Sequence, residues 1–132
     1  MTEGSVDASE PVVDAMAYGE PGDVAAVRSF VRSAALDRGL SAARAELLVL
    51  AVSELATNTI QHTTGGGRVR VWSDRHQVVC EVVDGGTDKR FGQMPAAESR
   101  RGRGLAIVRR VVDDLSTFAA PAGTVVQLRM NS

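Results

Sequence analysis

One long apolar segment constrains the fold of this chain more than any other feature. Residues 42–60 are rich in Ala, Val and Leu, follow Ser41, and are followed by the three glycines 65–67. The apolar residues recur at helical spacing, and Ser is favoured at the position that caps a first turn. The segment is therefore predicted as a long helix that ends before the glycines. A shorter helix is predicted ahead of it, from an N-cap at Asp23 to a stop at Gly39.

Polar residues fall on a face of the long helix that otherwise looks apolar. On a helical wheel Glu54 shares an arc that is predicted to be buried with five apolar residues, Leu47, Leu48, Leu50, Ala51 and Leu55. Asn58 and His62 follow four and eight residues after Glu54, so all three line one side. Burying a carboxylate and an amide without partners is costly, which points to a metal, a ligand or a polar network. The alternative is that the apolar stripe gives way to a solvated surface at the helix end.

The second half of the chain is predicted to form strands with one helix among them. Alternating apolar residues predict strands at 68–72 and 78–83, a helix at 105–112, and a hairpin of strands at 115–119 and 124–130. Helices followed by strands indicate an α/β (α+β) two-layer sandwich. We expect a mixed, mostly antiparallel sheet covered on one face by helices.

Charge is spread unevenly along the chain. The formal net charge is -1, but residues 1–23 hold six acids and no base. Residues 1–20 are therefore predicted to be a flexible acidic tail, with a possible edge strand at 12–18, ahead of a single domain at 21–132. Five arginines between positions 100 and 110 form a basic patch suited to an anionic ligand.

Cysteine content and hydropathy narrow the class of protein. The single cysteine, Cys80, excludes a disulfide framework and a cysteine-rich zinc site. We find neither a secretion signal nor an apolar run long enough to span a membrane. A cytoplasmic location is therefore expected.

Strand alternation places two further polar residues toward the helices. Glu81 is predicted to point to water, so Asp84 at the end of the same strand points inward, just before two glycines. Thr124 in the last strand faces the same interior. Each has a simpler alternative, because Asp often initiates a turn before glycines and Thr is common in strands.

A glycine-rich segment precedes the predicted third helix. Residues 101–105 read Arg-Gly-Arg-Gly-Leu within a long loop, 84–103, and loops of this length are usually functional. Glycines let backbone N–H groups turn toward a ligand, and a helix N-terminus favours anions. The segment fits neither a P-loop nor a dinucleotide-binding fingerprint.

Taken in their order along the chain, the polar stretch of the long helix, the Asp-Gly-Gly segment and the arginine–glycine segment resemble the motifs of the GHKL ATPases. This family includes histidine kinases, heat-shock chaperones, gyrase B and MutL. Residues 54–58 look like its E-x-x-x-N box, and residues 84–86 look like its D-x-G box. Residues 102–105 look like its later glycine box, and Thr124 matches a late-strand threonine. The closest likeness, over roughly residues 20–130, is to the small bacterial anti-sigma factor serine/threonine kinases and related actinobacterial ATP-binding regulators.

The resemblance implies a Bergerat-type ATP-binding fold with ATP and Mg²⁺ as ligands. Asn58 would ligate Mg²⁺, Glu54 would act as the catalytic base, and Asp84 would accept a hydrogen bond from adenine. The remaining nucleotide-binding residues that it implies are His62, Gly86, Arg101, Gly102, Arg103, Gly104, Leu105 and Thr124.

The implied function is a kinase that regulates transcription by phosphorylating an anti-sigma factor antagonist. The alternative from a different class is an ATP-binding anti-sigma or regulatory module with little or no kinase activity. A third is an α/β domain that binds no nucleotide. The expected partners are a sigma factor, the antagonist protein, or both, and a second copy of the chain joined through the first strand and helix. Neither nucleic acid nor a membrane is expected as a direct partner.

Overall fold

The computed structural model describes residues 12–62, 66–84, 106–121 and 123–132, and every structural statement below concerns them. Residues 106–111 form a short helical segment. The other elements, in chain order, are β1 (Asp14–Tyr18), α2 (Asp23–Asp37), α3 (Ala42–His62), β2 (Gly67–Asp74), β3 (Gln77–Asp84), β4 (Asp114–Ala120) and β5 (Gly123–Asn131). In this part of the chain, no helix is long and apolar enough to cross a membrane.

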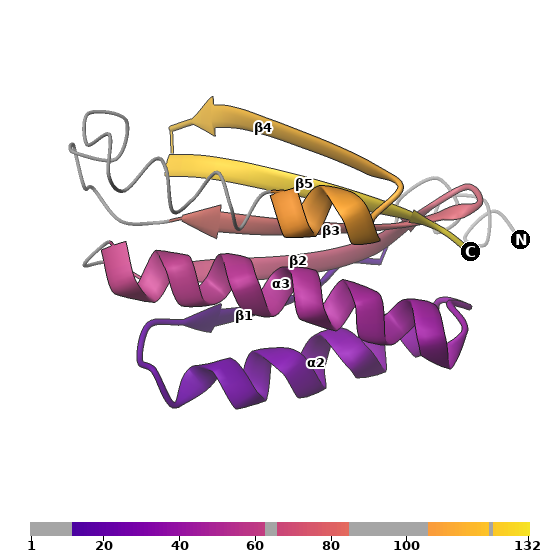
Figure 1. The fold of residues 1–132 in the computed structure, drawn as a ribbon, viewed down its shortest axis with the longest axis horizontal. Coiled ribbons are helices and arrows are strands. Elements are labelled where there is room, and N and C mark those ends of the chain that lie inside the picture. Colours follow the sequence, from indigo (N-terminus) through magenta and orange to yellow (C-terminus); the bar gives the residue numbers. More distant parts are fainter. Residues whose placement is uncertain (1–11, 63–65, 85–105, 122) are drawn as a thin grey trace, which may run out of the picture.

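The strands form one sheet in the order β1-β2-β3-β5-β4, and all four described ladders are antiparallel. Helices α2 and α3 lie side by side across the sheet, and the short segment 106–111 lies over its other half (Figure 1). The predicted two-layer α/β architecture is confirmed. The four strands predicted in the second half of the chain are also found, each longer than expected by one or two residues at its ends. The possible edge strand predicted at 12–18 is found two residues shorter, as β1. Strand β1 adds an edge to the sheet ahead of α2.

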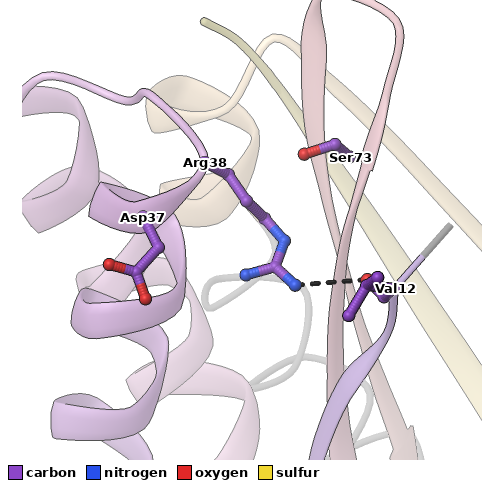
Figure 2. A pocket seen from close by; sticks show the side chains of 4 residues that line it. All are labelled: Val12, Asp37, Arg38 and Ser73. Atoms are coloured by element: carbon purple, nitrogen blue, oxygen red, sulfur yellow. Dashed lines mark hydrogen bonds between the residues drawn. The ribbon is translucent and has the colours of Figure 1, made fainter. Parts of the chain in front are cut away.

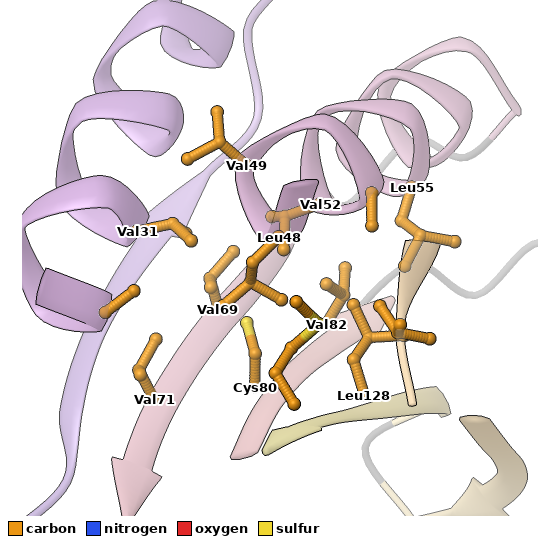
Figure 3. Packing of buried hydrophobic residues seen from close by; sticks show 14 of the residues in the cluster. Val31, Leu48, Val49, Val52, Leu55, Val69, Val71, Cys80, Val82 and Leu128 are labelled. Atoms are coloured by element: carbon orange, nitrogen blue, oxygen red, sulfur yellow. The ribbon is translucent and has the colours of Figure 1, made fainter. Parts of the chain in front are cut away.

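The core fills the space between the helices and the sheet with aliphatic side chains (Figure 3). Each fully buried Val or Leu contributes about 1.5–3 kcal/mol to folding. A sequence with only 4% aromatic residues must build its core in this way. The central members, taken from α2, α3, β2, β3 and β5, are Val31, Leu48, Val52, Val69, Val71, Cys80 and Leu128.

The predicted buried face of α3 is confirmed on one side and wrong on the other. Leu48, Ala51 and Leu55 are buried as predicted, whereas Leu47 and Leu50 are 37% and 44% exposed. The cause is that α3 packs against α2 as well as against the sheet, so its buried arc is wide and centred near Val52 (Figure 3). Apolar residues occur almost all round this helix, so periodicity alone does not locate the edges of the buried arc.

The predicted cap of α2 also needs correction. The N-cap position belongs to Gly22, which makes no side-chain capping bond, and Asp23 is the first helical residue. The Asp23 carboxylate instead accepts hydrogen bonds from the backbone N–H groups of Gly19 and Glu20, both at 2.9 Å. These bonds lower the pKa of Asp23 and hold the turn between β1 and α2. The cap of α3 is as predicted, since Ser41 Oγ accepts a hydrogen bond from a backbone N–H at 3.2 Å.

Glu81 was expected to point into water, and this prediction is wrong in part. Its side chain lies on the sheet face away from the helices, but the residue is only 8% exposed. Arg70 Nη1 and Gln127 Nε2 on the flanking strands donate to its two carboxylate oxygens at 3.1 and 3.0 Å. These long neighbours cover the carboxylate and satisfy it.

Two glycines let β1 approach β2 closely. A Cβ at Gly67 would lie 2.4 Å from the Val83 carbonyl oxygen and 2.6 Å from the Tyr18 hydroxyl oxygen. Gly66 has φ +65°, and a Cβ there would lie 2.2 Å from the Tyr18 carbonyl oxygen. The ring of Tyr18 therefore occupies the space that a side chain at position 67 would need.

We predict that Gly67→Ala destabilises the protein because the added methyl group meets backbone as well as the phenol. Overpacking of this kind costs about 1–3 kcal/mol, which lowers the melting temperature by several degrees. Gly19→Ala is the matched control, since its Cβ would meet nothing closer than the Gly66 Cα at 3.9 Å. Thermal denaturation of both variants tests this, and equal melting temperatures would contradict the close packing at position 67.

Candidate functional site

Helix α3 finishes over the end of the sheet where β2 starts and β3 ends (Figure 1). A row of paired residues crosses the sheet there. The strand register places Tyr18 opposite Gly67, Gly67 opposite Asp84, and Asp84 opposite Thr124. Residues directly opposed in antiparallel strands point to the same face, with Cβ atoms about 4.5–5.5 Å apart. As strand alternation predicts, Asp84 is buried, with 8% exposure. The row therefore brings a phenol, a carboxylate and a hydroxyl group together under the helix layer.

Helix α3 brings two of the predicted polar residues to one edge of its buried face. Glu54 and Asn58 are half-buried and stand four residues apart, which is about one helical turn. Thr59, next to Asn58, is buried and its hydroxyl donates to the Leu55 carbonyl oxygen at 3.1 Å. Glu54 and Asn58 thus lie between the buried side of α3 and the exposed side that carries Leu50.

The row and the helix meet at Tyr18. Burial raises the pKa of the Tyr18 phenol to about 12; the nearby Thr59 hydroxyl opposes this rise and the charge of Asp84 adds to it. Three polar groups from β1, α3 and β3 are therefore close enough to influence one another. Thr59 therefore brings its turn of α3 to this row, and Asn58 stands on the adjoining edge of the same turn.

Sequence reasoning missed Tyr18 and Thr59. Neither residue belongs to a recognisable short motif, and their proximity depends on the pairing of β1 with β2. One signal was available, since Tyr18 is the only tyrosine of the chain and ends the predicted edge strand.

Part of the predicted site lies outside the described residues. His62 is the last residue of α3, and its side chain belongs to this undescribed part. The long loop carries Gly86 and the predicted phosphate-binding segment 101–105, and both fall in the part that the structure does not describe. Of the predicted basic patch, Arg109 and Arg110 are described, and both are exposed on the short helical segment.

A shallow hollow of about 400 Å³ lies elsewhere on the surface (Figure 2). Val12, Asp37, Arg38 and Ser73 line it. Arg38 Nη2 donates to the Val12 carbonyl oxygen at 3.2 Å and forms an ion pair with Asp14 at 2.9 Å. Arg38 thus fastens the start of β1 to the end of α2. This hollow adjoins the end of β2 opposite Gly67, so it is distinct from the row.

Comparison with protein families identifies this arrangement. The sequence profile of the Histidine kinase-like ATPase domain matches residues 18–130. The chain belongs to this family. A comparison with curated proteins finds no match. Histidine kinase-like ATPase domains bind ATP, generally with Mg²⁺. The match spans every described element from the last residue of β1 to near the end of β5, so it includes the row and α3.

The donor set of the ATPase domain fits Mg²⁺ that arrives with a nucleotide. Among the residues that the structure describes, no group of three or more His, Cys, Asp or Glu side chains could hold a metal ion. Mg²⁺ usually keeps several waters and binds through one or two protein oxygens plus phosphate oxygens. The half-buried carboxamide of Asn58 and carboxylate of Glu54 are such oxygens, one helical turn apart.

Proposed function

We propose that this protein is an ATP-dependent serine/threonine kinase and anti-sigma factor that phosphorylates an anti-sigma factor antagonist. The supporting observation is that Glu54 and Asn58 share one edge of α3 beside the buried row that contains Asp84, in a histidine kinase-like ATPase domain. The choice of this subgroup rests on the likeness of residues 52–58 and 101–108 to its members.

The row would bind the adenine base. The Asp84 carboxylate only accepts hydrogen bonds when ionised, which suits the donor amino group of adenine. Thr124, opposite Asp84 on β5, carries a hydroxyl that can donate or accept beside it. Gly86 would let the base approach the backbone.

The edge of α3 and the arginine–glycine segment would hold the phosphates. The Asn58 carboxamide oxygen would ligate Mg²⁺, which neutralises charge on the phosphate oxygens when it is bound. His62, one turn later, would stand beside them. The N–H groups of segment 101–105 and the guanidinium groups of Arg101 and Arg103 would supply further positive potential.

Glu54 would act as general base. Its carboxylate accepts the proton of a serine or threonine hydroxyl as that oxygen bonds to the γ-phosphorus. The bond from the γ-phosphorus to the bridging oxygen breaks, and ADP leaves with the electron pair. The chain's own contribution is to position the hydroxyl and take its proton, as in other phosphoryl transfers.

Two variants of α3 separate binding from transfer. Asn58→Ala should abolish most of the rise in melting temperature that Mg-ATP produces, which in free energy is about 2.7 kcal/mol at a hundredfold excess over Kd. Glu54→Gln should keep that rise but lose about 10²–10⁴-fold in transfer of labelled phosphate to the antagonist, because it lacks a general base.

Glu46→Gln is the matched control. Glu46 is an exposed carboxylate of the same helix, paired with Arg32, and its loss should change neither readout. Transfer by Glu54→Gln at the wild-type rate would contradict the kinase proposal. If wild-type protein binds Mg-ATP and a sigma factor but transfers no phosphate, the chain is instead the ATP-binding regulatory module.

Asp84→Asn tests adenine recognition. The amide group offers a donor as well as an acceptor, so ATP affinity should fall about 10–100-fold, as for the loss of a hydrogen bond to a charged group. Asp74→Asn, at the other end of β2, is the control for the same chemical change. Calorimetric titration with ATP measures the effect. An unchanged affinity in Asp84→Asn would mean that adenine binds to another part of the fold.

We further propose a homodimer joined through β1 and α2. β1 is an edge strand, paired on one side only, and Val13 beside it is exposed. Light scattering should give twice the chain mass, and Val13→Lys should give the monomer mass. Phe118→Lys, which places the same charge at an exposed apolar position of β4 on the opposite edge of the sheet, should remain dimeric. A monomeric wild-type protein would contradict the proposal.

A further inference from the structure

We propose that Tyr18 is a positioning residue for nucleotide recognition. In the nucleotide-bound form its buried hydroxyl donates a hydrogen bond to the Asp84 carboxylate and so fixes the acceptor that receives the adenine amino group. This inference rests on the proposed function, because it assumes that adenine is bound beside Asp84.

The geometry aims the phenol at Asp84. Tyr18 ends β1, and its ring leans over β2 so far that its hydroxyl oxygen would lie 2.6 Å from a Cβ at Gly67. Gly67 is the direct cross-strand neighbour of Asp84. The hydroxyl therefore lies over β2 at Gly67, near enough to Asp84 on the next strand for the carboxylate to influence it. Position 67 must be glycine for the phenol to reach this place.

The Tyr18 hydroxyl makes no hydrogen bond of regular geometry with the described residues, although the Thr59 hydroxyl lies close enough to interact with it. The residue is only 5% exposed. Burying a hydroxyl group without a partner is unfavourable, and phenylalanine would fill the same space without this cost. A buried hydroxyl group without a regular hydrogen bond in the free protein is accounted for if it forms that bond in the nucleotide-bound form.

Among the neighbouring groups, Asp84 is the stronger acceptor. The Thr59 hydroxyl lies nearby but is neutral, and its proton is already directed to the Leu55 carbonyl oxygen. A carboxylate accepts charge-assisted hydrogen bonds that are roughly twice as strong as neutral ones, and its two oxygens can accept several at once. The Asp84 carboxylate can therefore accept from Tyr18 and from a base together.

The proximity of Asp84 keeps the Tyr18 proton in place. Both burial and the charge of Asp84 raise the pKa of the phenol, so it remains protonated throughout the physiological range. Because the phenol of Tyr18 keeps its proton and an ionised carboxylate can only accept, Tyr18 is the donor in any hydrogen bond between them. Binding of adenine beside Asp84 would align the two groups, because the base would exclude water and order the carboxylate.

The experiment compares wild-type protein with Tyr18→Phe, which deletes one oxygen atom and no carbon. Without nucleotide, Tyr18→Phe should melt at the wild-type temperature or above it, since it removes an unsatisfied group. Its affinity for Mg-ATP should fall about tenfold, the factor expected from one hydrogen bond to a charged group. Ser29→Ala, which deletes an exposed hydroxyl on α2, should leave both quantities unchanged.

A spectroscopic readout follows the hydroxyl directly, because Tyr18 is the only tyrosine. The single Trp72 lies on β2 beside Arg70, whose guanidinium carbon is 5.5 Å from the indole ring centre. In a Trp72→Phe background, Mg-ATP should shift the ultraviolet absorption of the phenol, and this shift should be absent when Tyr18 is also replaced. Thr59→Val in the same background should retain the shift if Asp84 is the acceptor.

The outcomes separate this inference from the proposed function. If wild-type protein binds no adenine nucleotide, the proposed function fails. If it binds Mg-ATP but Tyr18→Phe binds equally well and the phenol spectrum does not respond, the role of Tyr18 fails alone. A Tyr18→Phe variant that melts lower without nucleotide and shows no selective loss of affinity would make the hydroxyl merely structural and overturn the inference.

Discussion

The pairing of β1, β2 and β3 is the constraint on which the candidate site depends. Gly67 stands between Tyr18 and Asp84, and only glycine leaves room there for the phenol above and the Val83 carbonyl oxygen beside it. A slip of one residue in either ladder would turn a site residue to the other face of the sheet. Backbone register and polar cluster therefore stabilise each other, and a change at position 67 disturbs both.

Helix α3 supplies the other wall of the site, and it can do so because its buried face is wide. Leu48 and Val52 anchor it between α2 and the sheet. Glu54 and Asn58 stand at the margin of that face, where a side chain is half-buried while its backbone is fixed by the core. Donors on a rigid helix hold a ligand geometry better than donors on a loop. The polar edge of α3 is thus a product of its hydrophobic packing.

Sequence patterns predicted the two layers, the strands and the inward direction of Asp84, because each depends on local alternation that the chain displays directly. They placed the buried arc of α3 too far toward Leu47 and Leu50, since these two residues are as apolar as the residues that are buried. They also placed Glu81 in water, because alternation gives the face of the sheet but not the neighbours that cover it. The place of Tyr18 beside Asp84 could not be predicted, although its edge strand was, since that place follows from cross-strand register between segments about fifty residues apart.

The distribution of polar groups along the sheet links stability to ligand binding. Val71, Cys80 and Leu128 form an apolar layer beneath the helices, whereas the row that contains Tyr18 and Asp84 buries polar groups at one end of the same sheet. An incompletely satisfied hydroxyl makes that end the costlier one to fold. A ligand that binds only the folded state shifts the equilibrium toward folding by mass action. The aliphatic part of the sheet therefore keeps the domain folded, and the polar end is where a ligand that completes the hydrogen bonds would stabilise it most.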